Sequence, residues 1–122
     1  MRTRIGAIAT LASAFLFSIP TGHAATRLTP AEIQTAFFNG TPFTASTPSG
    51  VKFKMVFAAD GNVTREPVAK TGAKGEGSWK LDKTGFCTTW KNQKPNCYEV
   101  LTNGANKWSI MKASNLVAVW SR

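Results

Sequence analysis

Few side chains in this chain of 122 residues have the chemistry needed for acid–base, nucleophilic or metal catalysis. The only histidine, His23, lies in an N-terminal segment with the pattern of a signal peptide, so we expect the mature chain to contain none. Without histidine the chain has no means of forming a Ser-His-Asp or Cys-His centre or a histidine-containing zinc site. We therefore expect neither a metal nor a cofactor.

The thiols are also predicted to be unavailable for chemistry. Cys87 and Cys97 are the only cysteines, and an even count in an exported chain favours a disulfide, for which only one pairing exists. Their spacing is neither C-x-x-C nor that of a zinc knuckle, which argues against a redox or metal pair. The bond would close a short loop and stabilise the fold by about 2–3 kcal/mol.

The carboxylates give no clear acid–base pair. Glu32 fits a helix cap, and Asp60 and Asp82 fit turns. The carboxylates without such a role are Glu66, Glu76 and Glu99. Nothing in their spacing singles out the two members of a glycosidase-like pair. The chain is therefore predicted not to be an enzyme, and a hydrolase that uses these glutamates is the less favoured alternative.

The aromatic and basic side chains are more informative. One tryptophan falls in each of four expected strands, namely Trp79, Trp90, Trp108 and Trp120. Most tryptophans of this kind fill a core, but some line a cavity or groove and stack on a ring of the ligand. Basic side chains that would fix an anionic group there, if they are not simply solvated, are Lys52, Lys54, Arg65, Lys80 and Lys91. The predicted ligand-binding set is Trp79, Trp90, Trp108, Lys52, Lys54, Arg65 and Lys80.

The N-terminus indicates export. Arg2 and Arg4 precede an apolar stretch, residues 5–19, and Gly22 and Ala24 supply the small residues of a cleavage site. The stretch is shorter than the roughly 20 residues that span a bilayer. Residues 1–24 are therefore predicted to be a cleaved signal peptide and residues 25–122 a single domain, periplasmic or secreted.

The positive net charge of the chain bears on which partners it could attract. Removal of Arg2 and Arg4 lowers the formal net charge from +9 to +7. The basic residues are spread along the chain, which is typical of a solubilising surface. The alternative is attraction to an anionic partner such as an envelope polymer, a lipid headgroup, a nucleic acid or an acidic protein.

One helix is clearly signalled. Thr29 suits the N-cap, Pro30 the first helical position and Glu32 the third, which together form a capping box. Gly40 suits the end of the helix, because glycine readily adopts the left-handed conformation. The predicted helix is about ten residues long and must dock on other elements to be stable.

From Gly40 onward the pattern favours short strands separated by turns. Glycine-rich residues 70–77 are predicted to be a mobile loop. The expected strands are 51–57, 63–68, a segment containing Trp79 and Leu81, 86–91, 98–101, 107–112 and 117–120. In the first of them, Val51, Phe53, Met55 and Phe57 share one face, and Lys52 and Lys54 lie on the other. We predict a mainly β fold, an antiparallel meander of seven or eight strands that forms a small barrel or half-barrel plugged by the N-terminal helix. A two-sheet sandwich is the alternative.

The two cysteines also suggest a register. If Cys87 lies directly opposite Cys97, the face away from the disulfide carries Phe86, Thr88, Trp90, Tyr98 and Val100. That aromatic face would be the core, and the disulfide would lie outside, near Lys91 and Glu99. A slip of one residue would reverse the two faces.

Several motifs together resemble a known group of proteins. They are Leu28 to Ile33, the Ala59-Asp60-Gly61 turn, Gly77-Ser-Trp79-Lys-Leu81, Phe86-Cys87-Thr-Thr-Trp90 and Cys97-Tyr98. This layout, which covers most of the mature chain, resembles small exported bacterial proteins of uncharacterised function. The resemblance implies a β-rich fold and a periplasmic or extracellular location, and it carries over no catalytic residue. The architecture is similar to lipocalin- and avidin-like barrels by analogy only.

The predicted function is that of a non-enzymatic binding module of the bacterial envelope. Its ligand would be a small molecule or an anionic envelope polymer. The alternative is a protein-interaction domain, an inhibitor or secreted effector, whose partner would be acidic because the chain is basic.

Overall fold

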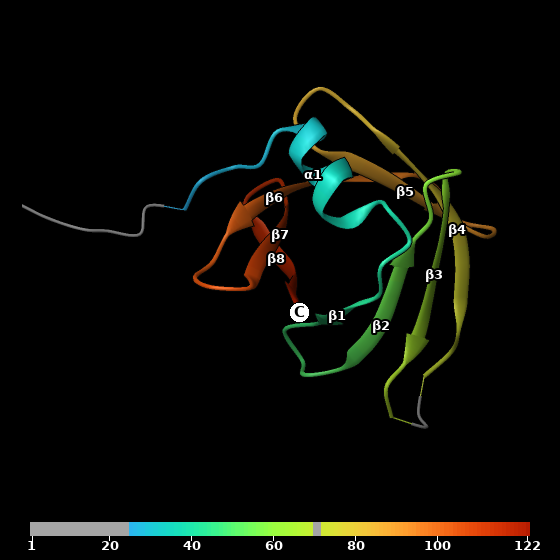
Figure 1. Cartoon of the computed structure of the whole chain (residues 1–122). Helices are drawn as coiled ribbons and strands as arrows, with labels where there is room; N and C mark the ends of the chain where they lie inside the picture. The colour runs from blue at the N-terminus through green and yellow to red at the C-terminus, as the bar shows by residue number, and fades with distance from the viewer. Residues whose placement is uncertain (1–24, 70–71) are drawn as a thin grey trace, which may run out of the picture.

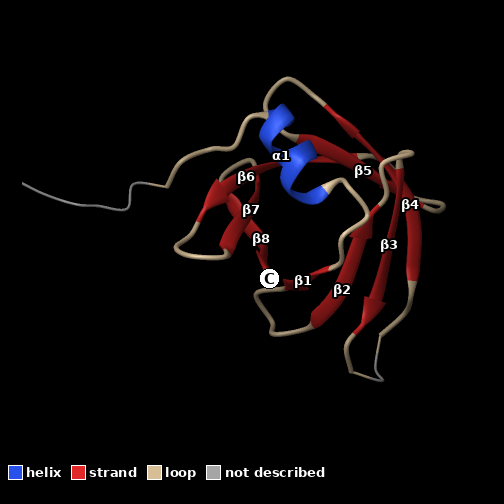
Figure 2. Cartoon of the chain, viewed as in Figure 1, coloured by secondary structure: helices blue, strands red, loops and turns tan. Residues whose placement is uncertain are grey.

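The computed structural model describes residues 25–69 and 72–122, so the predicted signal peptide lies outside the described residues. Within these residues, one helix is followed by eight strands: α1 (Pro30–Phe37), β1 (Phe43–Ser46), β2 (Lys52–Phe57), β3 (Asn62–Pro67), β4 (Gly75–Leu81), β5 (Phe86–Trp90), β6 (Asn96–Thr102), β7 (Lys107–Lys112) and β8 (Asn115–Ser121). Each strand pairs with the next, and β8 pairs with β1. The sheet is thus a closed antiparallel barrel, as predicted, and the sandwich is wrong (Figures 1 and 2).

Side chains alternate between the inside and the outside of the barrel. In β2, Met55 and Phe57 are buried and Phe53 is half-buried, whereas Lys52 and Lys54 are exposed, as the sequence predicts. The closed pairing requires one inward set on every strand, because a slip of one residue would turn a whole strand over. Within the part of the chain that the structure describes, no helix is long and apolar enough to cross a membrane.

The helix closes one end of the barrel (Figure 1). Its capping box is confirmed: the Glu32 backbone N–H donates to Thr29 Oγ1 at 3.2 Å, and the Thr29 N–H donates to Glu32 Oε1 at 2.8 Å. The Phe37 ring lies 4.8 Å from Trp108, and the Phe38 ring, at the C-cap, lies 4.3 Å from Phe57 (centroid distances). This end of the interior is therefore filled by aromatic rings.

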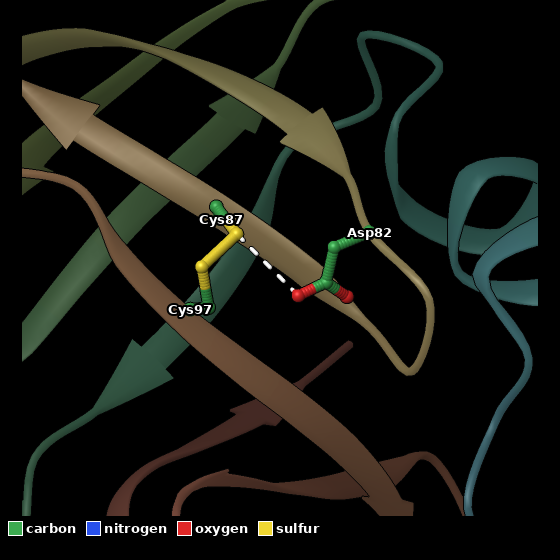
Figure 3. Close-up of side chains that lie close together, drawn as sticks. All are labelled: Asp82, Cys87 and Cys97. Atoms are coloured by element: carbon green, nitrogen blue, oxygen red, sulfur yellow. Dashed lines mark hydrogen bonds between the residues drawn. A yellow bond between two sulfur atoms is a disulfide. The ribbon is translucent and has the colours of Figure 1, made fainter.

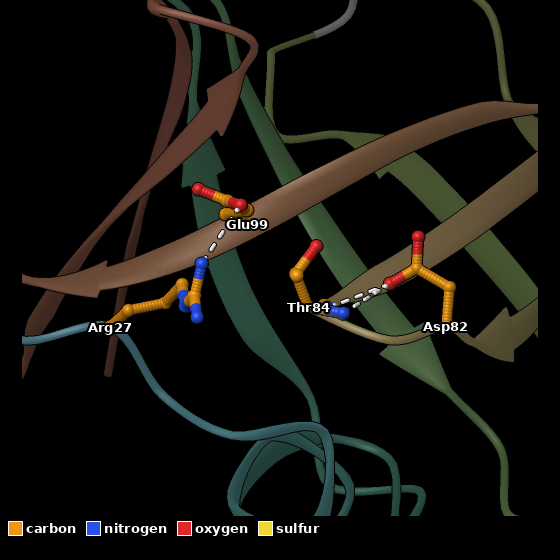
Figure 4. A network of polar contacts seen from close by, with 5 residues as sticks. Arg27, Asp82, Thr84 and Glu99 are labelled. Atoms are coloured by element: carbon orange, nitrogen blue, oxygen red, sulfur yellow. Dashed lines mark hydrogen bonds and ion pairs between the residues drawn. The ribbon is translucent and has the colours of Figure 1, made fainter.

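The segment before the helix is fixed to β6. Leu28 N–H donates to the Val100 carbonyl at 2.8 Å, and Arg27 forms a bridge with Leu101. Arg27 Nη1 also contacts Glu99 Oε2 at 3.2 Å (Figure 4). The segment occupies the edge of β6 beyond its pairing with β5, and it sets the position from which the helix enters the barrel.

The disulfide hairpin has the predicted register. Cys87 pairs with Cys97 and is bonded to it, and Phe86 pairs with Tyr98. The face away from the disulfide is internal: Phe86 and Thr88 are buried, and Trp90 is half-buried. Phe86, Thr88 and Trp90 also line the cavity, so the sulfurs lie on the opposite face of β5 and β6, where Cys97 is exposed and Cys87 is buried.

Two parts of the chain differ from the prediction. Strand β1 was not predicted, and β4 begins at Gly75 although the predicted loop extends to Gly77. Gly77 pairs with Val63 on one side and Trp90 on the other. A Cβ atom at Gly77 would lie 2.4 Å from the Thr89 carbonyl oxygen, so the close approach of β5 requires glycine inside this strand.

Candidate functional site

A cavity of about 170 Å³ occupies the part of the barrel that the helix does not fill. Its deep side is formed by Phe57, Phe86 and Trp120. These rings contact Phe37 at the end of α1 and Phe38 at its C-cap. Its walls include Ala45, Phe53, Met55, Ile110, Val117 and Ala118, and Thr47 lies at its rim in the β1–β2 turn. The cavity is thus mainly apolar and opens at the end of the barrel remote from α1.

Small residues and a β-bulge create this space. Ala45 and Ala118 occupy inward positions on neighbouring strands where larger side chains would fill the interior. Strand β8 has one extra residue opposite Ile110 and Met111, so the consecutive residues Val117 and Ala118 both line the cavity. A bulge re-aims side chains in this way.

Arg65 lies at the open end of the cavity. It points inward from β3, half-buried, with its guanidinium carbon 4.3 Å from the centroid of Trp90 and 5.5 Å from that of Phe53. A Cβ atom at Gly75 would lie 2.8 Å from Arg65 Nε. Because Gly75 has no side chain, the Arg65 side chain can pass over β4 at this position. The guanidinium is held by ring faces rather than by a carboxylate.

Two polar atoms at the cavity have no protein partner among residues 25–69 and 72–122. Arg65 Nε is buried without a hydrogen bond, and so is Thr88 Oγ1, in a residue that is only 3% exposed. An unsatisfied buried polar group costs about 1–3 kcal/mol. Both atoms are covered by neighbouring groups, but both residues line the cavity, so rotation of either side chain would bring its polar group to a bound molecule or water.

The structure brings together only part of the predicted site. Arg65 and Trp90 meet at the cavity. Trp79 and Trp108 lie instead against the helix: Trp79 Nε1 donates to the Ala58 carbonyl at 2.8 Å, and its ring contacts Phe38, while Trp108 contacts Phe37. The three predicted lysines, Lys52, Lys54 and Lys80, are exposed on the outer face of the barrel.

Several residues that line the cavity are not in the predicted ligand-binding set. Phe53 and Thr88 were placed on inward faces but were not assigned to a site. A hydroxyl between Phe86 and Trp90 on an otherwise aromatic face was the available signal for Thr88. Val117 and Ala118 could not be found, because the bulge that turns both inward depends on pairing with β7.

Lysines surround the open end. They lie at strand ends or in turns remote from the helix: Lys52, Lys74, Lys91, Lys94 and Lys112. The acidic residues described at this end are Glu66 and Glu76. Lys74 Nζ lies 3.5 Å from Glu66 Oε2, so this pair is largely neutralised. The remaining positive charge makes the mouth attractive to anions.

A second group of residues with ligand chemistry lies outside the barrel. Asp82 Oδ2 is 3.5 Å from Cys87 Sγ, and Cys97 is the bonded partner (Figure 3). A disulfide sulfur carries no hydrogen, so this is a contact and not a donated hydrogen bond. Asp82 Oδ1 instead accepts from the N–H groups of Thr84 and Gly85 (Figure 4), which fixes the turn. With both sulfurs oxidised, the group offers a metal only one carboxylate.

Comparisons with protein-family models, curated proteins and solved structures find no match. The function is therefore argued from the chemistry of the cavity, because a barrel fold alone does not specify a ligand.

Proposed function

We propose that the protein is an exported, non-enzymatic binding protein of the bacterial envelope that holds a small molecule inside its barrel. The observation that carries this proposal is the apolar cavity of about 170 Å³ with the unpartnered atoms Arg65 Nε and Thr88 Oγ1. Small barrels hold one small ligand in this position, and ligand sites combine apolar walls with a few polar groups.

The volume of the cavity limits the size of the ligand. An engineered apolar cavity of about 150 Å³ holds benzene. The part of the ligand enclosed here is therefore close to a single ring or a short branched chain. A polymer would reach the cavity only with one terminal group.

The lining supports binding without catalysis. Among the described residues that line the cavity, Arg65 and Tyr98 are the only ones with ionisable side chains. Neither is a carboxylate or an imidazole that would act as a general base near neutral pH. The Cys87–Cys97 disulfide and the signal-peptide pattern of residues 1–24 support export to an oxidising compartment.

Native mass spectrometry of the protein from its own host tests this proposal. Ala118→Leu places a larger side chain in the cavity, and Val119→Leu changes the next residue, which alternation places outside, as a matched control. We expect a discrete small-molecule adduct on the wild type and on Val119→Leu, and its loss from Ala118→Leu.

Two results would overturn the proposal. One is an adduct that Ala118→Leu leaves unchanged. The other is a polypeptide bound to all three proteins with no small adduct, which would favour the protein-interaction domain.

A further inference from the structure

We propose that the ligand is a compact monocarboxylate with one apolar ring, bound with its carboxylate at Arg65 and a hydrogen-bonding substituent at Thr88. This inference rests on the proposed function and names the chemical class that the cavity selects. It uses Arg65 and Thr88, the lining residues whose buried polar atoms have no hydrogen-bond partner in the part of the chain that the structure describes.

Arg65 is suited to a carboxylate. Its guanidinium carbon lies over the Trp90 ring, and Nε has no hydrogen bond to any of the described residues. No carboxylate of the described residues forms an ion pair with Arg65, and Glu66 contacts Lys74 instead. A planar guanidinium binds a carboxylate through two parallel hydrogen bonds.

The charge of the site limits the ligand to one negative charge. Among the described residues that line the cavity, Arg65 is the only cationic one. The remaining walls are mainly apolar, and a second buried charge without a partner would be costly. A dianionic phosphate is therefore disfavoured, while the lysines around the mouth still attract an anion from solution.

Thr88 lies at the deeper end of the proposed ligand site. It precedes Trp90 by two positions on the same face of β5, so it lies one layer deeper, roughly 7 Å along the strand. Its hydroxyl both donates and accepts. A single ring with substituents at opposite ends fits this separation, with the charged end at the mouth and the neutral polar end inside.

Isothermal titration calorimetry with four probes separates these contributions. The probes are 4-hydroxybenzoate, benzoate, phenol and toluene, which carry both groups, either group or neither. We expect the wild type to bind 4-hydroxybenzoate most tightly, at least tenfold more tightly than phenol. Benzoate should bind several-fold more weakly than 4-hydroxybenzoate, and toluene should bind most weakly.

Four variants assign the selectivity to residues. Arg65→Met should abolish the preference for 4-hydroxybenzoate over phenol, and Gly75→Ala should reduce it because the new Cβ displaces the guanidinium without changing the net charge. Thr88→Val should abolish the preference for 4-hydroxybenzoate over benzoate. Lys54→Met, which removes one charge from the outer face of β2, should change each affinity less than twofold.

The outcomes distinguish this inference from the proposed function. If phenol and toluene bind as tightly as 4-hydroxybenzoate and Ala118→Leu abolishes their binding, the cavity is a ligand site but the carboxylate class is wrong. If Thr88→Val leaves the preference for 4-hydroxybenzoate over benzoate unchanged, water satisfies the Thr88 hydroxyl and the proposed ligand substituent at Thr88 is wrong. If no probe binds the wild type, the inference is overturned. The ligand size that the proposed function derives from the cavity volume, close to a single ring, is then wrong as well.

Discussion

At the scale of single residues, the cavity depends on which side chains are absent as much as on which are present. Gly75 gives Arg65 its path across β4, and Gly77 lets Trp90 approach the same strand. The two glycines differ in what a side chain would meet. At Gly75 a Cβ atom meets a flexible arginine, whereas at Gly77 it meets the backbone of Thr89 and Trp90.

Gly77→Ala should therefore destabilise the fold. The new Cβ atom would lie 2.4 Å from the Thr89 carbonyl oxygen, and neither strand can move freely inside a closed barrel. Overpacking of this kind costs about 1–3 kcal/mol. Urea unfolding measures the difference, with exposed Ser78→Ala as the control on the same strand. Equal midpoints for the two variants would show that β4 and β5 are not packed this closely.

At the scale of elements, the features that depend on residues close together in the sequence were predicted correctly. The capping box at Thr29 and Glu32, the alternation in β2 and the Cys87–Cys97 register all follow from nearby residues and are confirmed. The start of β4 was missed because glycine disfavours strands unless a neighbouring strand requires the space. Arg65 and Trp90 were both in the predicted ligand-binding set, but their contact depends on pairing across three strands.

The disulfide belongs to the β5–β6 hairpin and should stabilise it without shaping the cavity. Replacing both Cys87 and Cys97 with serine should lower the free energy of unfolding by about 2–3 kcal/mol, because the unfolded chain regains the entropy of the short loop. Ligand affinity should stay within twofold at a temperature where the variant is folded, since Thr88 and Trp90 lie on the opposite face.

Denaturant unfolding and calorimetry on the oxidised wild type and the double variant make this comparison. A tenfold loss of affinity in the folded variant would contradict the separation of the two faces of the hairpin.

At the scale of the whole molecule, the barrel has two unlike ends. The helix and its phenylalanines fill one end, and lysines surround the other, where the cavity opens. Closure between β1 and β8 links the ends of the described sheet, and no local pattern in the sequence specified it. The division between the helix-filled end and the cavity explains why Trp79 and Trp108 pack against the helix while Trp90 lines the cavity.

The central claim is that a small molecule binds inside this barrel. The most direct measurement is intermolecular nuclear Overhauser spectroscopy with 4-hydroxybenzoate on protein labelled at its methionine and isoleucine methyl groups. We predict cross-peaks from the ring protons to the methyl groups of Met55 and Ile110, which line the cavity, and none to Ile33, which lies on the buried face of α1. Cross-peaks confined to residues outside the cavity, or no cross-peaks at saturating ligand, would contradict the account.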